Sequence, residues 1–179
     1  MRVADYIMER LYAMGVHHLF FVPGSGCMHL TDALAKHTQL QGVSMHHEQA
    51  AAMAALSYAK YNMNFGACLV TTGCGGTNTF TGLLHAWQDN VPCMFIAGQA
   101  QQDHTVRNSH LPLRQFGRQE ADILSLVEPI TKYAVMIDNP MKTRYYFEKA
   151  VYMAKEGRPG PVWLDIPLDI QNALIMNPD

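Results

Sequence analysis

Short, continuously apolar segments alternate with segments of helical periodicity along the whole chain of 179 residues. Continuous apolar strands separated by helices are typical of a parallel sheet that is buried on both faces. We therefore predict an α/β domain, a three-layer sandwich with a central, mostly parallel sheet of about six strands and helices on both faces. The predicted strands cover residues 18–22, 40–45, 67–71, 92–97, 131–137 and 160–166.

The segments between these strands place apolar residues at helical spacing, as Val3, Ile7 and Leu11 do in the first of them. Gly15 follows that segment at the place where a helix C-terminal cap belongs. A polar loop is expected from Gln99 to about Gln115. The predicted helices cover residues 3–14, 30–37, 48–62, 78–89, 121–127 and 140–155, the last with a proline in its first turn.

The composition is that of an ordinary globular domain, with 49% apolar and 16% charged residues and a net charge of -2. This charge gives no reason to expect nucleic acid or an anionic membrane surface as a partner. The cysteines form no Cys-x-x-Cys pair, and no apolar run is long enough to span a bilayer. We expect a soluble cytoplasmic protein with reduced thiols.

Three polar or glycine-rich segments follow predicted strands directly, at residues 23–29, 46–49 and 72–78. Open parallel sheets bind their ligands at the carboxyl ends of their strands. The three segments are therefore expected to form one binding site.

Glu48 stands between the strand that ends near Met45 and an Ala-rich helix. A helix N-terminus favours the charged form of a carboxylate, whereas burial favours its neutral form. These opposing effects suit Glu48 to share a proton with a bound base.

Other kinds of site are less well supported by the same segments. Gly24 and Gly26 supply two glycines of a dinucleotide fingerprint, but His29 occupies the third position, and no Gly-Lys-Ser/Thr of a phosphate loop follows. His47-Glu48 does not continue to the second histidine of a zinc-protease motif, because Ala51 stands there. The turn at residues 73–78 alone is also compatible with an anion site at a helix N-terminus. An unrelated nucleotide-binding α/β domain therefore stays open on these segments alone.

In order and spacing, the motifs resemble the N-terminal pyrimidine-binding domain of thiamine-diphosphate enzymes, particularly acetolactate synthases and benzoylformate decarboxylases. Residues 23–34 match the synthase stretch that ends in Asp-Ala-Leu, and residues 157–167 match the family's closing strand. Residues 73–78 read Gly-Cys-Gly-Gly-Thr-Asn, with Cys74 in place of the synthase proline and Gly76 in place of its alanine. The resemblance covers about residues 3 to 170.

This resemblance implies that Glu48 hydrogen-bonds the aminopyrimidine of thiamine diphosphate and so activates the thiazolium ylid that attacks a 2-ketoacid. It implies catalytic roles for Glu48 and Ser25, and for Gln119 in the family sequence Gln-Glu-Ala-Asp-Ile; His29 is a further candidate because it follows the Ser25 loop. The residues implied to bind the cofactor are Pro23, Gly24, Glu48, Gly73, Cys74 and Asn78.

Arg118 departs from the synthase pattern, which usually places phenylalanine before the glutamine. Arginine suits carboxylate and phosphate groups, so Arg118 is a candidate contact for an anionic substrate. A solvated loop charge is the alternative.

The resemblance further implies that residues 1–170 form the pyrimidine-binding domain and that residues 171–179 begin a linker to an absent middle domain, where FAD would belong. The Gly-Asp-Gly motif of the diphosphate-binding domain, which holds Mg²⁺, is also absent from the sequence. We therefore expect the isolated chain to be inactive. We expect a diphosphate-binding domain of a paired subunit as its partner, in a homodimer or homotetramer. A non-catalytic or regulatory member of the family is the alternative.

Overall fold

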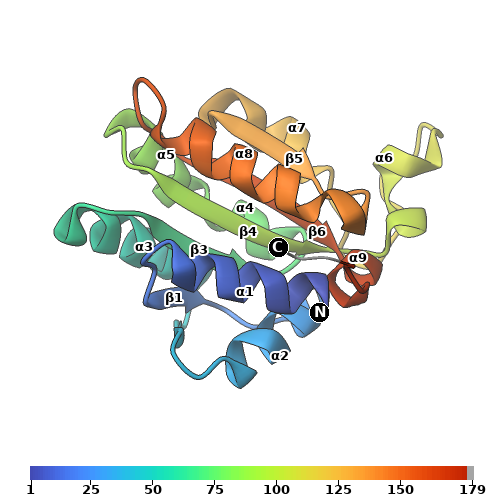
Figure 1. Ribbon diagram of the computed structural model, residues 1–179. Helices are drawn as coiled ribbons and strands as arrows, with labels where there is room; N and C mark the ends of the chain where they lie inside the picture. Colours follow the sequence, from blue (N-terminus) through green and yellow to red (C-terminus); the bar gives the residue numbers. More distant parts are fainter. Residues whose placement is uncertain (177–179) are drawn as a thin grey trace.

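Six strands form one all-parallel sheet in the computed structural model, which describes residues 1–176 (Figure 1). Their order across the sheet is β2-β1-β3-β4-β6-β5. The prediction of an α/β sandwich is confirmed, and the sheet is parallel throughout. The strands are β1 His18–Phe21, β2 Gln41–Ser44, β3 Gly66–Val70, β4 Cys93–Gln99, β5 Tyr133–Met136 and β6 Val162–Pro167.

Helices precede, connect and follow the strands. They are α1 Val3–Ala13, α2 Met28–Lys36, α3 Glu48–Asn62, α4 Cys74–Thr77, α5 Phe80–Gln88, α6 Val106–Ser109, α7 Ile123–Val127, α8 Thr143–Lys155 and α9 Leu168–Asn172. Short 3₁₀ turns are η1 Ser25–Cys27, η2 Gln102–His104, η3 Glu128–Ile130 and η4 Pro140–Lys142.

The helix predictions were correct for the long elements and wrong for some short ones. The helix predicted over residues 78–89 corresponds to α5, while α4 lies within the predicted glycine-rich turn and the predicted loop 99–115 contains η2 and α6. The helix α9 was not predicted. Helices of four or five residues are too short to show apolar periodicity, so the sequence pattern cannot reveal them.

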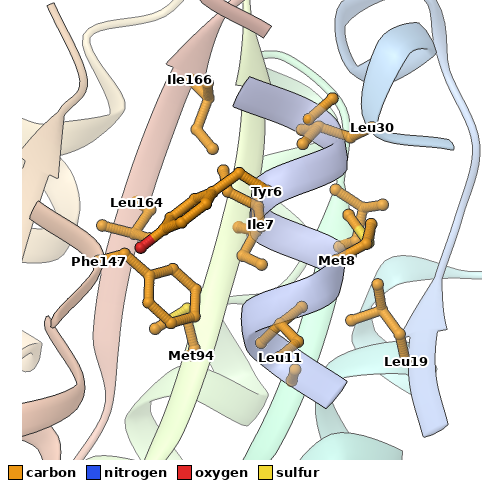
Figure 2. Packing of buried hydrophobic residues seen from close by; sticks show 14 of the residues in the cluster. Tyr6, Ile7, Met8, Leu11, Leu19, Leu30, Met94, Phe147, Leu164 and Ile166 are labelled. Carbon is orange, nitrogen blue, oxygen red and sulfur yellow. The ribbon is translucent and has the colours of Figure 1, made fainter. Parts of the chain in front are cut away.

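Each face of the sheet has its own apolar core. Met94 and Ile96 of β4 pack with residues of α1, α2, α8 and α9, whereas Phe95 and Ala97 pack with residues of α3, α5 and α7. Successive side chains of a strand point to opposite faces, so continuously apolar strands are buried on both sides. Figure 2 shows the first of these cores, in which Ile7 and Leu11 of α1 lie over Met94.

The beginning and end of the described chain pack together. The Val3 amide donates to the Ala173 carbonyl at 2.9 Å, and the Ile175 amide donates to the Met1 carbonyl at 2.9 Å. Of the expected linker residues 171–179, residues 177–179 lie outside the described part of the chain.

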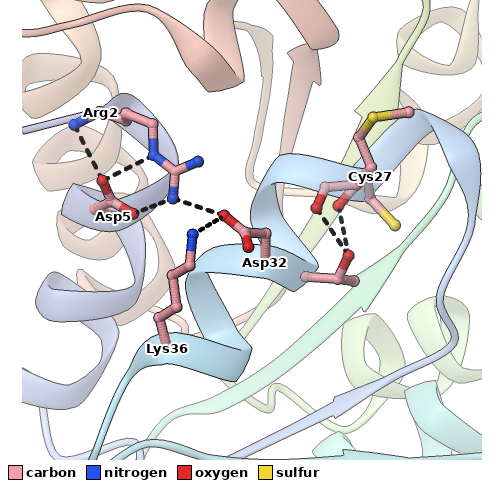
Figure 3. Close-up of polar contacts among 7 residues, drawn as sticks. Arg2, Asp5, Cys27, Asp32 and Lys36 are labelled. Atoms are coloured by element: carbon pink, nitrogen blue, oxygen red, sulfur yellow. Dashed lines mark hydrogen bonds and ion pairs between the residues drawn. The ribbon is translucent and has the colours of Figure 1, made fainter.

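An ion-pair network joins α1 to α2 at the same place (Figure 3). The Arg2 guanidinium contacts Asp5 at 2.6 Å and Asp32 at 2.9 Å, and Lys36 also contacts Asp32. Hydrogen bonds from Arg2 hold the pKa of the Asp5 carboxyl below its usual range. Among residues 1–176, no helix has the length and apolar character needed to cross a membrane.

Candidate functional site

The three segments chosen from the sequence meet at one edge of the sheet. Strand β1 lies between β2 and β3, and all three run parallel. Their carboxyl ends lead into η1, the N-terminus of α3 and the turn before α4. Since these ends are neighbours, Ser25, Glu48 and Gly73 lie on adjoining loops, as the strand pattern predicted.

Glu48 is the first residue of α3, as the sequence predicted, and its side chain is half-buried. The Nδ1 atom of the capping residue His47 accepts a hydrogen bond from the Gln49 amide at 3.1 Å, which fixes the start of the helix. The Asn78 amide group donates to Glu48 Oε2 at 2.9 Å. The two segments are therefore tied together through the carboxylate itself.

The second carboxylate oxygen of Glu48 lies close to Gly75. A Cβ atom added to Gly75 would lie 3.5 Å from Glu48 Oε1. In the described residues Oε1 accepts no hydrogen bond, while Oε2 is held by Asn78. The site thus offers one oriented oxygen to a ligand, next to a backbone without a side chain.

The loop that carries Ser25 is packed against the end of β3. The Gly26 amide donates to Thr71 Oγ1 at 3.0 Å, and a Cβ atom at Gly26 would lie 1.8 Å from Thr72 Oγ1. A Cβ atom at Gly24 would likewise lie 2.6 Å or less from atoms of the Thr71 side chain. Glycine is therefore required for this approach, and the side chain of Ser25 is left exposed, as is Pro23.

The backbone at Gly73 packs closely against the segment around Gln119. Gly73 has φ +61°, and a Cβ atom there would lie 2.0 Å from the Gln119 carbonyl oxygen. Gln119 itself has φ +58°, and its side chain is exposed, as are those of Arg118 and Cys74. The backbone of the Gln119 segment is thereby fixed beside the turn that leads to Asn78.

Replacement of Gly73 by alanine should lower the free energy of unfolding by more than replacement of Gly157. Both glycines have φ near +60°, but a Cβ atom at Gly157 meets no atom within 4 Å. A residue other than glycine loses about 1–3 kcal/mol in such a sparsely populated backbone region, and the ψ of -111° makes Gly73 especially dependent on glycine. Urea unfolding compares Gly73→Ala, which adds the contact with Gln119, with the control Gly157→Ala, which adds none. Equal losses in the two variants would contradict the close packing of Gln119 on Gly73.

The structure does not bring His29 into the cluster by any contact. His29 lies in the first turn of α2 and is half-buried, and within residues 1–176 it makes no hydrogen bond. Those same residues contain no group of three His, Cys, Asp or Glu side chains placed to hold a metal ion. All four cysteines are free thiols, and burial raises the pKa of Cys27 to about 11 and that of Cys93 to about 12.

A buried network behind the site involves residues that sequence reasoning missed. Gln99 Nε2, at the end of β4, donates to the Ala121 carbonyl at 3.0 Å and to Asp165 Oδ2 at 3.1 Å. The other oxygen of Asp165 is buried and has no hydrogen-bond partner in the described structure. Burial raises the pKa of Asp165 to about 8, which keeps this carboxyl protonated at neutral pH.

The Asp165→Asn variant should therefore be more stable than the parent at neutral pH. Between the ordinary carboxyl pKa of 3.8 and about 8, only the unfolded state ionises Asp165. The parent should lose stability as pH rises through this range, by up to about 1.4 kcal/mol per pH unit. Urea unfolding from pH 5 to 9 measures the difference between the slopes, with exposed Asp103→Asn as control. Parallel curves for the parent and Asp165→Asn would mean that Asp165 is ionised in the folded protein.

The roles of other supporting residues were not apparent from the sequence. Thr71 holds the Gly26 amide, and Gln171 Nε2 donates to the Gly26 carbonyl at 2.7 Å. Glu120 is buried and accepts hydrogen bonds from the amides of Val106 and Phe116. Glu120 belongs to the motif around Gln119, so only its presence, and not its role, was apparent from the sequence.

Comparisons with known proteins identify the family of the chain. Residues 1–126 match the family model described as "Thiamine pyrophosphate enzyme, N-terminal TPP binding domain". The chain is 37% identical over 172 residues to an acetolactate synthase of Arthrospira platensis, covering 94% of this chain and 28% of that protein. It is 36% identical over 170 residues to the acetolactate synthase large subunit of Corynebacterium glutamicum, covering 95% of this chain and 26% of that protein.

A chloroplastic acetolactate synthase of Arabidopsis thaliana is 34% identical over 174 residues, covering 96% of this chain and 24% of that protein. The chain thus spans about a quarter of the length of these relatives. The family match covers more than half of the chain and includes all three loops of the site. The chain therefore belongs to the family of N-terminal thiamine pyrophosphate-binding domains.

Proposed function

We propose that this chain is the pyrimidine-binding part of a thiamine-diphosphate-dependent 2-ketoacid decarboxylase or carboligase of the acetolactate synthase type. The observation that carries the proposal is the pair formed by Glu48 and Asn78 at 2.9 Å, beside Gly75. A ring nitrogen of a heteroaromatic base suits such a site, because Oε1 of the carboxylate accepts no hydrogen bond within the described residues.

Thiamine diphosphate, when bound, supplies a nucleophilic carbon and an electron sink for cleavage of the bond next to a carbonyl. The part of Glu48 is to hold a proton at Oε1 and share it with the pyrimidine ring nitrogen. Asn78 orients the carboxylate by donating to Oε2. The Pro23–Gly24 and Gly73–Cys74 backbones would border the cofactor. Ser25, Gln119 and His29 are the candidates for proton transfer or substrate contact.

The diphosphate group and Mg²⁺ need ligands beyond those that residues 1–176 offer. No set of metal-binding side chains exists in residues 1–176, and the sequence contains no Gly-Asp-Gly. We place these ligands in a diphosphate-binding domain of a paired subunit, in a homodimer or homotetramer. An open groove of about 640 Å³ among α3, α5 and η3 supports such pairing, since Met53, Leu84 and Ile130 line it. The free thiols fit a reducing compartment such as the cytoplasm.

Titration of the complete enzyme with thiamine diphosphate, NAD and ATP tests this function. Binding of thiamine diphosphate alone, dependent on Mg²⁺ and followed by carbon dioxide release from a 2-ketoacid, is the expected result. Binding of NAD or ATP instead would identify a nucleotide-binding domain. Binding of thiamine diphosphate without any turnover would identify a non-catalytic member of the family.

Arg118 should influence substrate choice in the complete enzyme. It is exposed and precedes Gln119, whose backbone contacts the Gly73 turn. A charge-assisted hydrogen bond to an anionic group is worth about 1.5–3 kcal/mol, or about one to two decades in kcat/KM. We expect the complete enzyme to prefer an anionic second substrate to pyruvate, and Arg118→Phe to lose this preference. The ratio of kcat/KM values on a panel of aldehydes and ketoacids measures it. Arg114→Phe, in the same exposed loop, is the matched control. An unchanged ratio of kcat/KM values would make Arg118 a solvated loop charge.

A further inference from the structure

The short helix α9 lies beside two of the loops that border the candidate site. It follows β6 directly and packs Ile170 and Gln171 into the core, where they are 3% and 0% exposed. In Figure 1 it lies at the base of the protruding segment that carries α6. One side of the helix is thus buried, while Asp169 and Asn172 are exposed.

Gln171 fixes the loop that carries Ser25. Its Nε2 atom donates to the Gly26 carbonyl at 2.7 Å and to the Ile166 carbonyl at 2.7 Å. Gly98 packs against the same peptide, because a Cβ atom there would lie 2.0 Å from the Gly26 oxygen. Gln171 therefore connects the Ser25 loop to the carboxyl end of β6, across 145 positions of sequence.

Asp169, in the same helix, fixes the second loop, which begins at Gln102. Its Oδ1 accepts from the Gln102 amide at 3.0 Å, and its Oδ2 accepts from Gln102 Nε2 at 3.1 Å. The Gln102 carbonyl in turn accepts from Thr105 Oγ1 at 2.9 Å and from Asn108 Nδ2 at 3.3 Å. The contact with Asp169 thus anchors the beginning of the segment that leads through α6 to Arg118.

We propose that Gln171 and Asp169 are positioning residues for the substrate side of the site. Through them, α9 fixes the position of the Ser25 loop relative to the segment that begins at Gln102. The assignment of these loops to the substrate side rests on the proposed function. Glu48 and Asn78 lie outside this arrangement, because their contact joins α3 to the end of α4. Loss of the Asp169 anchor should therefore affect substrate turnover while leaving the cofactor half of the site intact, whereas Gln171 also holds the loop that includes Gly24.

Hydrogen exchange of this chain tests the anchors without any cofactor. Gln171→Met keeps the side-chain length and removes the donor, so it should speed exchange in residues 24–28 and leave residues 101–108 unchanged. Asp169→Ala should do the reverse. Asp169→Asn, which retains one acceptor, should fall between the parent and Asp169→Ala. Asn172→Ala, at an exposed position of the same helix, is the control.

Steady-state kinetics of the complete enzyme form the second arm. We expect Gln171→Met and Asp169→Ala to lower kcat/KM for the 2-ketoacid by at least about tenfold, since small displacements of contact groups cost this much. For Asp169→Ala, the concentration of thiamine diphosphate for half-saturation should match that of Asn172→Ala. A general structural defect would instead lower kcat/KM and weaken the binding of thiamine diphosphate together.

Unchanged exchange in both anchor variants would overturn the proposal, as would kcat/KM values equal to those of Asn172→Ala. If the buried Gln171→Met variant does not fold, the exposed Asp169 variants still decide the matter. Faster exchange in an enzyme that never acts on 2-ketoacids would refute the proposed function and leave the two anchors established.

Discussion

Replacement of Glu48 by glutamine is expected to lower kcat of the complete enzyme by about 10²–10⁴-fold, the usual range for loss of an acid–base group. Glutamine has nearly the same shape and can still accept the hydrogen bond that Asn78 donates to Oε2. It cannot share a proton with a ring nitrogen. The fold and the packing at the start of α3 should therefore survive while turnover is lost.

The control is Glu128→Gln, which removes an exposed carboxylate in η3. Its kcat and its free energy of unfolding should equal those of the parent. Turnover of Glu48→Gln within a few-fold of the parent would remove Glu48 from its acid–base role. A large loss of stability in Glu48→Gln would instead show that Glu48 has a structural role.

The isolated chain should show no decarboxylase or carboligase activity and should bind thiamine diphosphate weakly. It offers the pyrimidine side of the site, but residues 1–176 hold no metal-binding cluster for Mg²⁺ and the diphosphate. Calorimetric titration with and without Mg²⁺ measures the affinity, and carbon dioxide release measures the activity. Addition of the diphosphate-binding domain should restore both.

Tight, Mg²⁺-dependent binding by the isolated chain would contradict this division of the site. The matched measurement uses thiamine without its phosphates. Its affinity for the chain should be similar to that of thiamine diphosphate, since the chain should recognise only the pyrimidine end.

The sequence was most informative where periodicity and loop chemistry agreed. The helix predicted over residues 48–62 has these same bounds in the structure. Continuous apolar segments such as β3, which is buried along its full length, predicted a sheet covered on both faces. From that sheet followed the meeting of the Ser25, Glu48 and Gly73 loops, because parallel strands end at a common edge.

Contacts between distant segments were beyond sequence reasoning. The Gly73 turn meets the Gln119 carbonyl, and Gln171 meets the Gly26 carbonyl, but neither contact follows from local spacing. The helix α9 has five residues, too few to establish an apolar repeat. The raised pKa of Asp165 has a similar origin, since its burial depends on elements from several parts of the chain.

The rate at which the thiazolium C2 proton of bound thiamine diphosphate exchanges with deuterium tests the central claim most directly. The measurement compares the complete enzyme with its Glu48→Gln variant, each saturated with cofactor and without substrate. We predict that Glu48→Gln slows the exchange by at least about 10²-fold, while Glu128→Gln leaves it unchanged. Equal exchange rates in the parent and Glu48→Gln would contradict the assignment of Glu48 as the proton-sharing group of this site.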